Sequence, residues 1–420
     1  MRIQWPTQPK SPPPLPDESL LQTLIETAYL ASMETEEARS LRFTLCCTPS
    51  SMDAPAQGQA GAVEVWPFAK DRTFSAQEIR RLSVATNLDT SALWVQFSHN
   101  AQEPLTIHGL LNLGMPWTSA PNAFAYYYDS LPEALLLRVE APGQIAVYCG
   151  ESLVASLKSG HIQVENQLAT HDLVAIDPIL REGHSVLRAQ IPAPSRAVER
   201  NWEQYEWLAY VNTVLAVVSA IQRSGHGGAL ILARMGSRLI SDNYVRVKYR
   251  LAGGAAHLSR RFVQFVSQHH RYMDVVSLAK RASDSPVVQR QLLTDYLIRD
   301  ALHRLAEACA FVGNLASTDG ALVMRTDFTV EGFGAEILLD KARRATVYAP
   351  DDEDARGMTV MDSEQFGMRH RSAIRLCGSV PDVAVIVVSQ DGGVSLVWNQ
   401  DGKACFKTGI SISHSGMLIG

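Results

Sequence analysis

Apolar strand segments separated by helical segments constrain the fold most strongly, and they lie beyond residue 200. Ala229–Ala233 and Val383–Val388 are continuous apolar runs of strand length, as expected of strands that are covered on both faces. Between them, Val288–Val312 has a mainly helical pattern and Leu322–Met324 resumes a strand. Helices interleaved with such strands predict a mixed sheet flanked by helices, an α/β (α+β) fold.

The part of the chain before residue 190 has a different pattern. Apolar positions from Ser19 to about Arg39 follow helical spacing, and Ser75–Asn87 predicts a helix with Ser75 as N-cap and Glu78 at the capping-box position. Short runs between Ala134 and Val164 are separated by turn residues, which indicates a β-meander. These segments predict a separate mixed α+β module.

Proline positions suggest where the modules begin and end. Six prolines between residues 6 and 16 favour an extended tail, residues 1–17. Pro192 and Pro194 hinder regular pairing and predict a linker at residues 190–200. We therefore expect an α+β regulatory or sensor module at 18–189 and a second domain at 201–420.

Charge and cysteine content restrict the partners and the compartment. The 420 residues carry 38 basic and 43 acidic side chains, a formal net charge of -5, so no global positive field favours nucleic acid. Six cysteines show no CxxC spacing, and the apolar helix Leu208–Ile221 is too short to span a bilayer. A cytoplasmic protein with reduced thiols and no membrane or nucleic-acid partner is expected.

Adjacent histidines offer one more candidate site. His269 and His270 have no partner at metal-ligand spacing, and neighbouring residues on a helix point in different directions. The pattern predicts surface histidines rather than a zinc site.

Three short segments combine residue types suited to binding a nucleotide. They are Gly228-Ala229-Leu230 at a strand, Asp319-Gly320-Ala321 before another strand, and Gly367-Met368-Arg369-His370-Arg371-Ser372 leading into a helix. Each alone has an ordinary structural explanation: a buried strand, a turn, or a solvated helix start. Arginines and a helix N-terminus nevertheless suit a small anionic ligand.

In this order, followed by Val388-Ser389 and Gly393-Val394-Ser395, the segments resemble the diadenylate cyclase (DAC) domain, whose hallmarks are Asp-Gly-Ala and Arg-His-Arg motifs. The resemblance covers roughly residues 201–407. It implies condensation of two ATP molecules into cyclic di-AMP, with Mg2+ or Mn2+ as cofactor. It also implies two domains meeting face to face, hence a homodimer or higher homo-oligomer.

The resemblance also implies roles for individual residues. Asp319 would hold the metal or orient the attacking hydroxyl, Arg369 and Arg371 would bind phosphate oxygens, and His370 would donate to the same group or to the leaving pyrophosphate. These four are the expected catalytic residues. The expected nucleotide-binding residues are Gly228, Ala229 and Leu230 at the adenine, Gly320 and Ala321 at the close backbone approach, Gly367 and Ser372 at the helix start, and Ser389 at phosphate or ribose.

Several positions depart from the family pattern. Met368 supplies no hydroxyl where a threonine or serine is common, and Gln390 and Asp391 stand where glutamates usually follow. Thr318 stands where some members place a metal-binding histidine. The stretch between Leu230 and Asp319 and the loop 340–365 are both longer than in compact cyclases.

Three functions remain open at this stage. The first is a metal-dependent cyclase with an N-terminal regulatory module. The second is a DAC-like sensor that binds ATP or a related nucleotide with little or no catalysis, since the architecture also resembles bacterial proteins described as probable DAC-like sensors. The third is a structural interaction protein that keeps the fold without a ligand.

Overall fold

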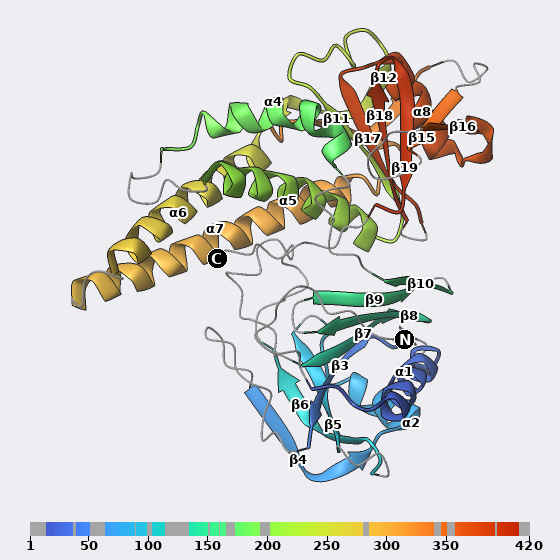
Figure 1. Cartoon of the computed structure of the whole chain (residues 1–420), viewed down its shortest axis with the longest axis vertical. Helices are drawn as coiled ribbons and strands as arrows, with labels where there is room; N and C mark the ends of the chain where they lie inside the picture. Colours follow the sequence, from blue (N-terminus) through green and yellow to red (C-terminus); the bar gives the residue numbers. More distant parts are fainter. Residues whose placement is uncertain are drawn as a thin grey trace. The chain divides into compact units, whose positions relative to one another are not determined.

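The computed structural model describes residues 14–36, 39–50, 64–88, 90–98, 103–113, 134–149, 152–158, 160–164, 173–193, 202–279, 285–339, 346–350, 358–390 and 393–410. The chain forms two compact units that divide between Gln167 and Leu168. The linker had been predicted at residues 190–200, which lies after this division. Each unit has its own sheet and helices (Figure 1).

The N-terminal unit is built on one sheet. Among the described residues it has eight strands in the order β10-β9-β8-β7-β3-β5-β6-β4. β3 and β5 pair in parallel, and their other neighbours pair antiparallel. The strands are β3 (Phe43–Pro49), β4 (Glu64–Thr73), β5 (Ser91–Phe97), β6 (Thr106–Asn112), β7 (Leu135–Ala141), β8 (Gln144–Cys149), β9 (Ser152–Lys158) and β10 (His161–Val164). A short hairpin, β1 (Thr35–Glu36) with β2 (Arg39–Ser40), precedes them.

Two capped helices accompany this sheet. α1 (Glu18–Ser32) begins at Asp17, whose side chain accepts from the Leu20 N–H at 2.9 Å. α2 (Ala76–Ser83) begins at Ser75, whose hydroxyl accepts from the Glu78 N–H at 3.2 Å. The Ser75 cap and the meander β7 to β10 are confirmed, because both follow from local patterns.

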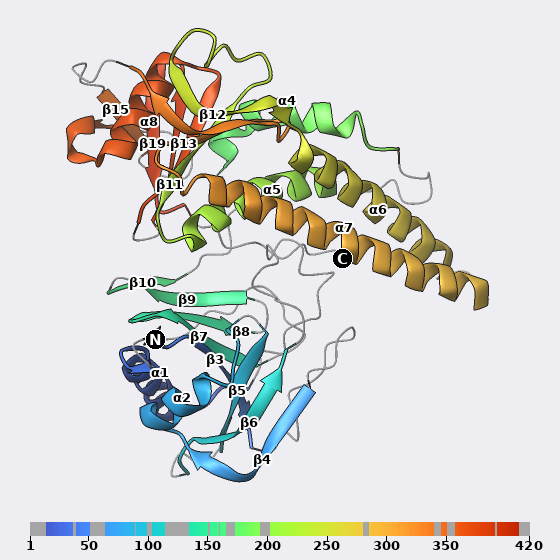
Figure 2. The same ribbon diagram turned by 180° about the vertical axis from the view of Figure 1, so that it is seen from behind.

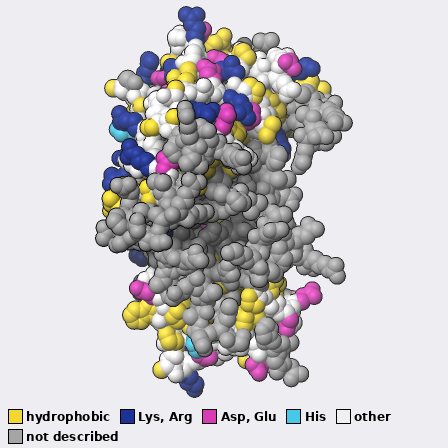
Figure 3. Space-filling view, turned by 60° about the vertical axis from the view of Figure 1, so that its left-hand side comes forward, with side chains coloured by type: hydrophobic (Ala, Val, Ile, Leu, Met, Phe, Trp, Pro, Cys, Tyr) yellow, Lys and Arg dark blue, Asp and Glu magenta, His cyan; other side chains and the backbone are white. Residues whose placement is uncertain are grey.

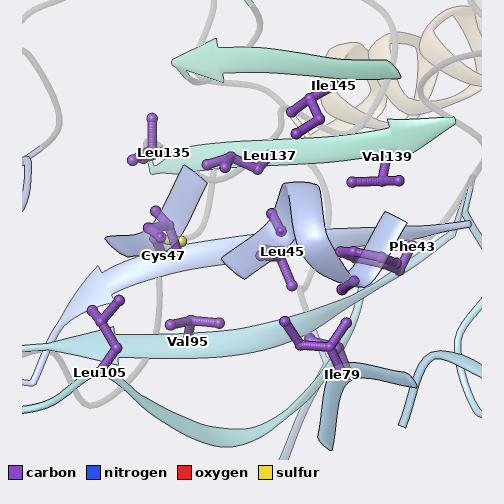
Figure 4. Close-up of a cluster of buried hydrophobic side chains, with 14 of the residues drawn as sticks. Phe43, Leu45, Cys47, Ile79, Val95, Leu105, Leu135, Leu137, Val139 and Ile145 are labelled. Atoms are coloured by element: carbon purple, nitrogen blue, oxygen red, sulfur yellow. The ribbon is translucent and has the colours of Figure 1, made fainter. Parts of the chain in front are cut away.

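One face of the sheet and the two helices enclose the main core of this unit. Figure 4 shows side chains of β3, β5, β7 and β8 and of α2 pointing into it, among them Leu45, Leu137 and Ile79. A fully buried side chain of this size contributes about 1.5–3 kcal/mol. A smaller apolar cluster around Trp94 lies on the opposite face. The two apolar clusters of this unit are therefore built from residues at alternating positions along the strands, one set on each face of the sheet.

The C-terminal unit contains a larger sheet. Its described strands follow the order β12-β14-β13-β11-β17-β18-β19-β15-β16, which is a mixed sheet. The strands are β11 (Gly228–Ala233), β12 (Val245–Ala255), β13 (Ala321–Arg325), β14 (Val330–Ile337), β15 (Thr346–Pro350), β16 (Met358–Asp362), β17 (Val383–Val388), β18 (Val394–Gln400) and β19 (Lys403–Thr408). The predicted α/β (α+β) class is confirmed.

Helices cover both faces of this sheet. α8 (Met368–Ser379) packs on β17, β18 and β19, and its residues share a core with alternate residues of β11, β13 and β17. α5 (Trp202–Arg223) packs on β11 and β17 and contacts α7 (Ser285–Leu315), which runs beside α6 (His257–Ala279). Figures 1 and 2 both show α5, α6 and α7 running alongside one another and α6 and α7 extending past the sheet.

Several elements of this unit were not predicted: β15 and β16 lie within the segment 340–365 that was expected to be a loop, β19 was not foreseen, and α4 (Asp177–Arg188) and β12 are two more. α4, preceded by the 3-10 turn Val174–Ile176, packs on α5 and α6, and a Cβ at its Gly183 would lie 2.2 Å from the backbone of Thr326. β12 was missed although Val245–Arg250 alternates apolar and basic residues as a half-buried strand does. Together β12, α6 and α7 account for the long stretch between Leu230 and Asp319. Within the described residues, no helix is long and apolar enough to cross a membrane.

Candidate functional site at the end of three strands

Strand register brings the three sequence segments to one end of the sheet. β11 pairs in parallel with β13, with Ala229 opposite Ala321, and antiparallel with β17, with Gly228 opposite Val388. The beginnings of β11 and β13 therefore lie beside the end of β17. Asp319 and Gly320, just before β13, and Ser389, just after β17, lie at this same end.

The helix carrying the Arg-His-Arg motif contributes Arg369 to this end. Gly227 immediately precedes β11 and has a φ of 64°. A Cβ at this position would lie 2.8 Å from the Val388 carbonyl oxygen, 2.9 Å from Nη1 of Arg369 and 3.0 Å from the Gln390 nitrogen. The Arg369 guanidinium therefore rests directly on the loop between α5 and β11. Gly227 was not among the predicted site residues.

Two predicted glycines are needed for packing within the chain. Gly320 has a φ of 117°, and a Cβ there would lie 2.5 Å from the carbonyl carbon of Gly334 on β14. A Cβ at Gly228 would lie 2.9 Å from the Ala316 carbonyl oxygen and from Ile221. These close approaches explain both glycines without a ligand, so their nucleotide-binding role stays a prediction.

The remaining segment residues differ in accessibility. Asp319 and Arg369 are exposed, and neither forms an ion pair with any residue that the structure describes. Ala229, Leu230 and Ala321 are buried in the sheet, and Leu230 is fully so. Ser389 and Ser372 are half-buried. Asp319 and Arg369 are therefore the charged side chains of the three segments that a ligand at this strand end could reach.

His370 points from the helix onto the sheet. Its Nε2 lies 3.2 Å from the hydroxyl oxygen of Ser395 on β18, and its ring meets Phe406 edge-on at a centroid distance of 5.7 Å. Ser395 is buried. His370 thus anchors the first turn of α8 and is half-buried beside Arg369.

Arg371 lies on the other flank of α8. Its Nη1 donates to Oε2 of Glu364 at 2.8 Å, and Nη2 of Arg375 lies 3.7 Å from Oε1 of the same carboxylate. Side chains two residues apart on a helix diverge by about 200°. The structure therefore brings Arg369, but not Arg371, to Gly227.

The start of α8 is open. Gly367 is its N-cap, with φ -64° and ψ 165°, and no side chain caps the helix. Nothing lies within 4 Å of where a Gly367 Cβ would be. The first backbone N–H groups of a helix lack internal partners and favour anions. This helix start and Arg369 supply positive potential at the same place.

The predicted metal rests on one carboxylate of known position. In the part of the chain that the structure describes, no three His, Cys, Asp or Glu side chains are grouped for a metal ion. Asp391 lies outside the described residues. Mg2+ commonly uses one or two carboxylates together with phosphate and water oxygens, so Asp319 suits a metal that arrives with a nucleotide. The cofactor stays a prediction.

Histidines buried between helices were missed. His269 and His270 are buried, so the prediction of surface histidines is wrong. Nε2 of His270 lies 3.2 Å from Oε1 of the buried Glu206, and its Nδ1 lies 3.2 Å from the Pro192 carbonyl oxygen. Burial, and then the charge of His270, lower the pKa of His269 to about 3. The sequence feature that could have predicted the burial of these histidines is the set of aromatic residues on α5, because Tyr205 stacks on His269 at a centroid distance of 3.8 Å.

A family model matches the N-terminal part of the chain, away from the candidate site. Residues 10–112 match the family described as Probable sensor domain DACNV. Within that range the structure describes α1, α2 and the strands β1 to β6. A comparison with curated proteins finds no match to this chain. The DACNV match supports a sensor within the predicted 18–189 module and carries no information on catalysis.

Figure 3 shows the surface charges over one face of the molecule. Lys and Arg side chains are interspersed with Asp and Glu over the described surface there. The candidate site itself has local positive charge from Arg369 and from the start of α8. A small anion is a better match to such a site than a long polyanion.

Proposed function

We propose that this chain is a DAC-like sensor protein whose C-terminal unit binds ATP or a related nucleotide with little or no turnover. The observation that carries the proposal is the position of Arg369. Its guanidinium lies against Gly227, at the strand end where Asp319 precedes β13. An exposed cation and an exposed carboxylate therefore share one end of adjacent strands.

Phosphate recognition would use Arg369 and the open helix start. A guanidinium offers several N–H donors to phosphate oxygens. The uncapped N–H groups after Gly367 add further donors and the favourable end of the helix dipole. Hydrogen bonds from charged donors contribute about 1.5–3 kcal/mol each. Both elements would act on the same phosphate group.

Asp319 would complete the site on the β13 side. Its carboxylate can accept from ribose hydroxyls or share a divalent ion with the phosphates. When bound, such an ion would neutralise phosphate charge. Gly320 keeps Asp319 close to β14, because any larger residue would collide with Gly334.

Weak turnover follows from what the site lacks. Phosphoryl transfer depends on positioning and on neutralising charge in the transition state. Arg371 is paired with Glu364 on the far flank of α8. Met368 is exposed and has no hydroxyl, and Gln390 has no charge. Among the described residues, one arginine and one carboxylate of the motifs reach this strand end, a set that suits binding better than catalysis.

The N-terminal unit supports the sensor part of the proposal. Its DACNV match carries the description of a probable sensor domain. Signal detection would therefore lie before residue 168, and the nucleotide would be the ligand of the second unit. A cytoplasmic location and a homo-oligomer belong to the same proposal.

A cyclase is the second candidate, favoured by one observation. Asp319 is exposed and free of ion pairs among the described residues, so it is available to a metal. Condensation would also require a second copy of the domain, bringing its own ATP.

Product analysis separates these candidates. Purified full-length chain is incubated with ATP and Mg2+ or Mn2+, nucleotide retention is measured, and products are separated by chromatography. The proposal expects bound nucleotide without cyclic di-AMP above a protein-free control. Cyclic di-AMP that disappears on Asp319→Asn would establish the cyclase instead. Folded protein that retains no nucleotide would overturn both and leave a structural role.

A further inference from the structure

The outer strand of the large sheet carries a row of exposed cations, one of which, Lys248, has its Nζ 5.2 Å from the centroid of the neighbouring Tyr249 ring. Among the described residues, β12 has β14 on one side and no strand on the other. Arg246, Lys248 and Arg250 alternate along it and are exposed. None of the three forms an ion pair with a described residue, although Glu336 stands opposite Arg246 on β14. This row is a positive feature on a chain of net charge -5.

The opposite face of the same strand is apolar. Val245 is buried, Val247 packs on the core beneath α8, and Tyr249 stacks on Phe333 of β14 at a centroid distance of 5.0 Å. Tyr249 remains 43% exposed. Because side chains of a strand alternate between faces, an added strand would meet cations on one face and an aromatic ring on the other.

We propose that β12 binds an extended acidic segment of a partner protein by strand addition. The free backbone edge would pair with the segment, which is a common mode of peptide recognition. Acidic residues at every second position would stand opposite Arg246, Lys248 and Arg250, since cross-strand neighbours lie about 4.5–5.5 Å apart between Cβ atoms. Apolar residues at the intervening positions would pack on Tyr249. The partner is thus an alternating acidic and apolar sequence.

Basic residues on an edge strand have another known effect, which is to discourage pairing between sheets. The two explanations predict different behaviour. A deterrent row repels strands of any composition or simply stays solvated, whereas a recognition row selects negative charge. Charge reversal therefore distinguishes them.

The test uses full-length chain and a fluorescent peptide of alternating Glu and Val. A matched Lys and Val peptide and a Glu and Pro peptide serve as ligand controls, because Pro cannot donate to a strand pair. The variant R246E/K248E/R250E is compared with K70E/R271E/K403E, which changes the same net charge at three exposed positions on other elements. Circular dichroism and thermal unfolding establish that both variants fold.

Saturable binding of the Glu and Val peptide, reduced at least about tenfold in R246E/K248E/R250E and unchanged in K70E/R271E/K403E, supports the proposal. The Lys and Val peptide should then prefer the reversed strand, and the Glu and Pro peptide should not bind. Absence of peptide binding to folded wild type overturns the proposal and leaves the deterrent role. Two further results also overturn it. If the wild type is a dimer that binds no peptide and R246E/K248E/R250E is a monomer, the edge pairs with a second copy of the chain. If the wild type binds polyuridine and not the peptide, the row recognises nucleic acid.

Discussion

The Arg371 guanidinium lies 2.8 Å from the Glu364 carboxylate, on the flank of α8 opposite to Arg369. Arg369 instead rests on Gly227 at the start of β11. The two arginines of one motif therefore have separate tasks. Arg369 faces the strand end that we propose binds nucleotide, and Arg371 ties α8 to the 3-10 turn Ser363–Gln365.

Removing Arg371 should have little effect on nucleotide binding. We expect Arg371→Ala to change the Kd for ATP by less than about threefold, because its guanidinium is held by Glu364. The partly exposed ion pair itself is worth about 0–1 kcal/mol, so the thermal midpoint should also change little. Titration calorimetry measures the first effect and scanning calorimetry the second. A Kd raised as much as by Arg369→Ala would show that both arginines bind the ligand.

Replacing Gly227 tests the close packing of the loop before β11 on the end of β17. A Cβ in the left-handed region costs about 1–2 kcal/mol, and collision with the Val388 carbonyl should add about 1–3 kcal/mol. Gly225→Ala is the matched control, because Gly225 has a φ of 72° and nothing within 4 Å of its would-be Cβ. Urea unfolding should therefore show Gly227→Ala to be the less stable variant. Equal stabilities of Gly227→Ala and Gly225→Ala would mean that the loop shifts to accommodate the added Cβ without loss of stability.

Acid should destabilise the C-terminal unit through His269. The folded pKa of about 3 lies below the ordinary value because of burial, while the unfolded value is about 6.5. The stabilisation is therefore complete above about pH 6.5 and is lost as the pH falls toward about 3. Between pH 6.5 and pH 5 one proton corresponds to about 2 kcal/mol.

His269→Phe isolates this contribution, since a ring remains to stack on Tyr205. Urea unfolding followed by tryptophan fluorescence should show a smaller loss of stability from pH 7.5 to pH 5 in this variant. His303→Phe, at a half-exposed position on α7, should retain the full loss. The account fails if wild type and His269→Phe respond equally to acid.

The core of the N-terminal unit should depend on Leu45. This residue is fully buried between β5 and β7, so Leu45→Ala should cost about 2–5 kcal/mol. Leu30→Ala, on the exposed side of α1, should stay within about 0.5 kcal/mol. Chemical denaturation gives both numbers. A mild Leu45→Ala would mean that this core collapses around the lost side chain.

Local signals in the sequence predicted the elements whose structure is decided locally. Ser75 caps α2 as expected, and the apolar runs became the central strands β11 and β17. The order of the motifs predicted that Gly228, Asp319 and Arg369 contribute to one site, and that role stays a prediction. Strand pairing brings Gly228 and the residues before β13 to one end of the sheet, and α8 brings Arg369 against Gly227.

Long-range packing decided the rest. The direction of Arg371 depends on Glu364 in the 3-10 turn Ser363–Gln365 before the helix, and no spacing rule links the two. His269 and His270 are buried because α4, α5 and α6 pack against one another around them. Their polar side chains alone had suggested surface positions. β12 is an exception, because Val245–Arg250 alternates apolar and basic residues, the local pattern of a strand with one solvated face, and this signal was overlooked.

The nucleotide site itself is tested most directly by titrating ATP into wild type and Arg369→Ala in the calorimeter, with Mg2+ present. The account predicts saturable binding to wild type and a Kd raised by at least about tenfold in Arg369→Ala, as expected for the loss of a charged hydrogen bond. Equal affinities, or no binding heat from folded wild type, would contradict a nucleotide site at the ends of β11, β13 and β17.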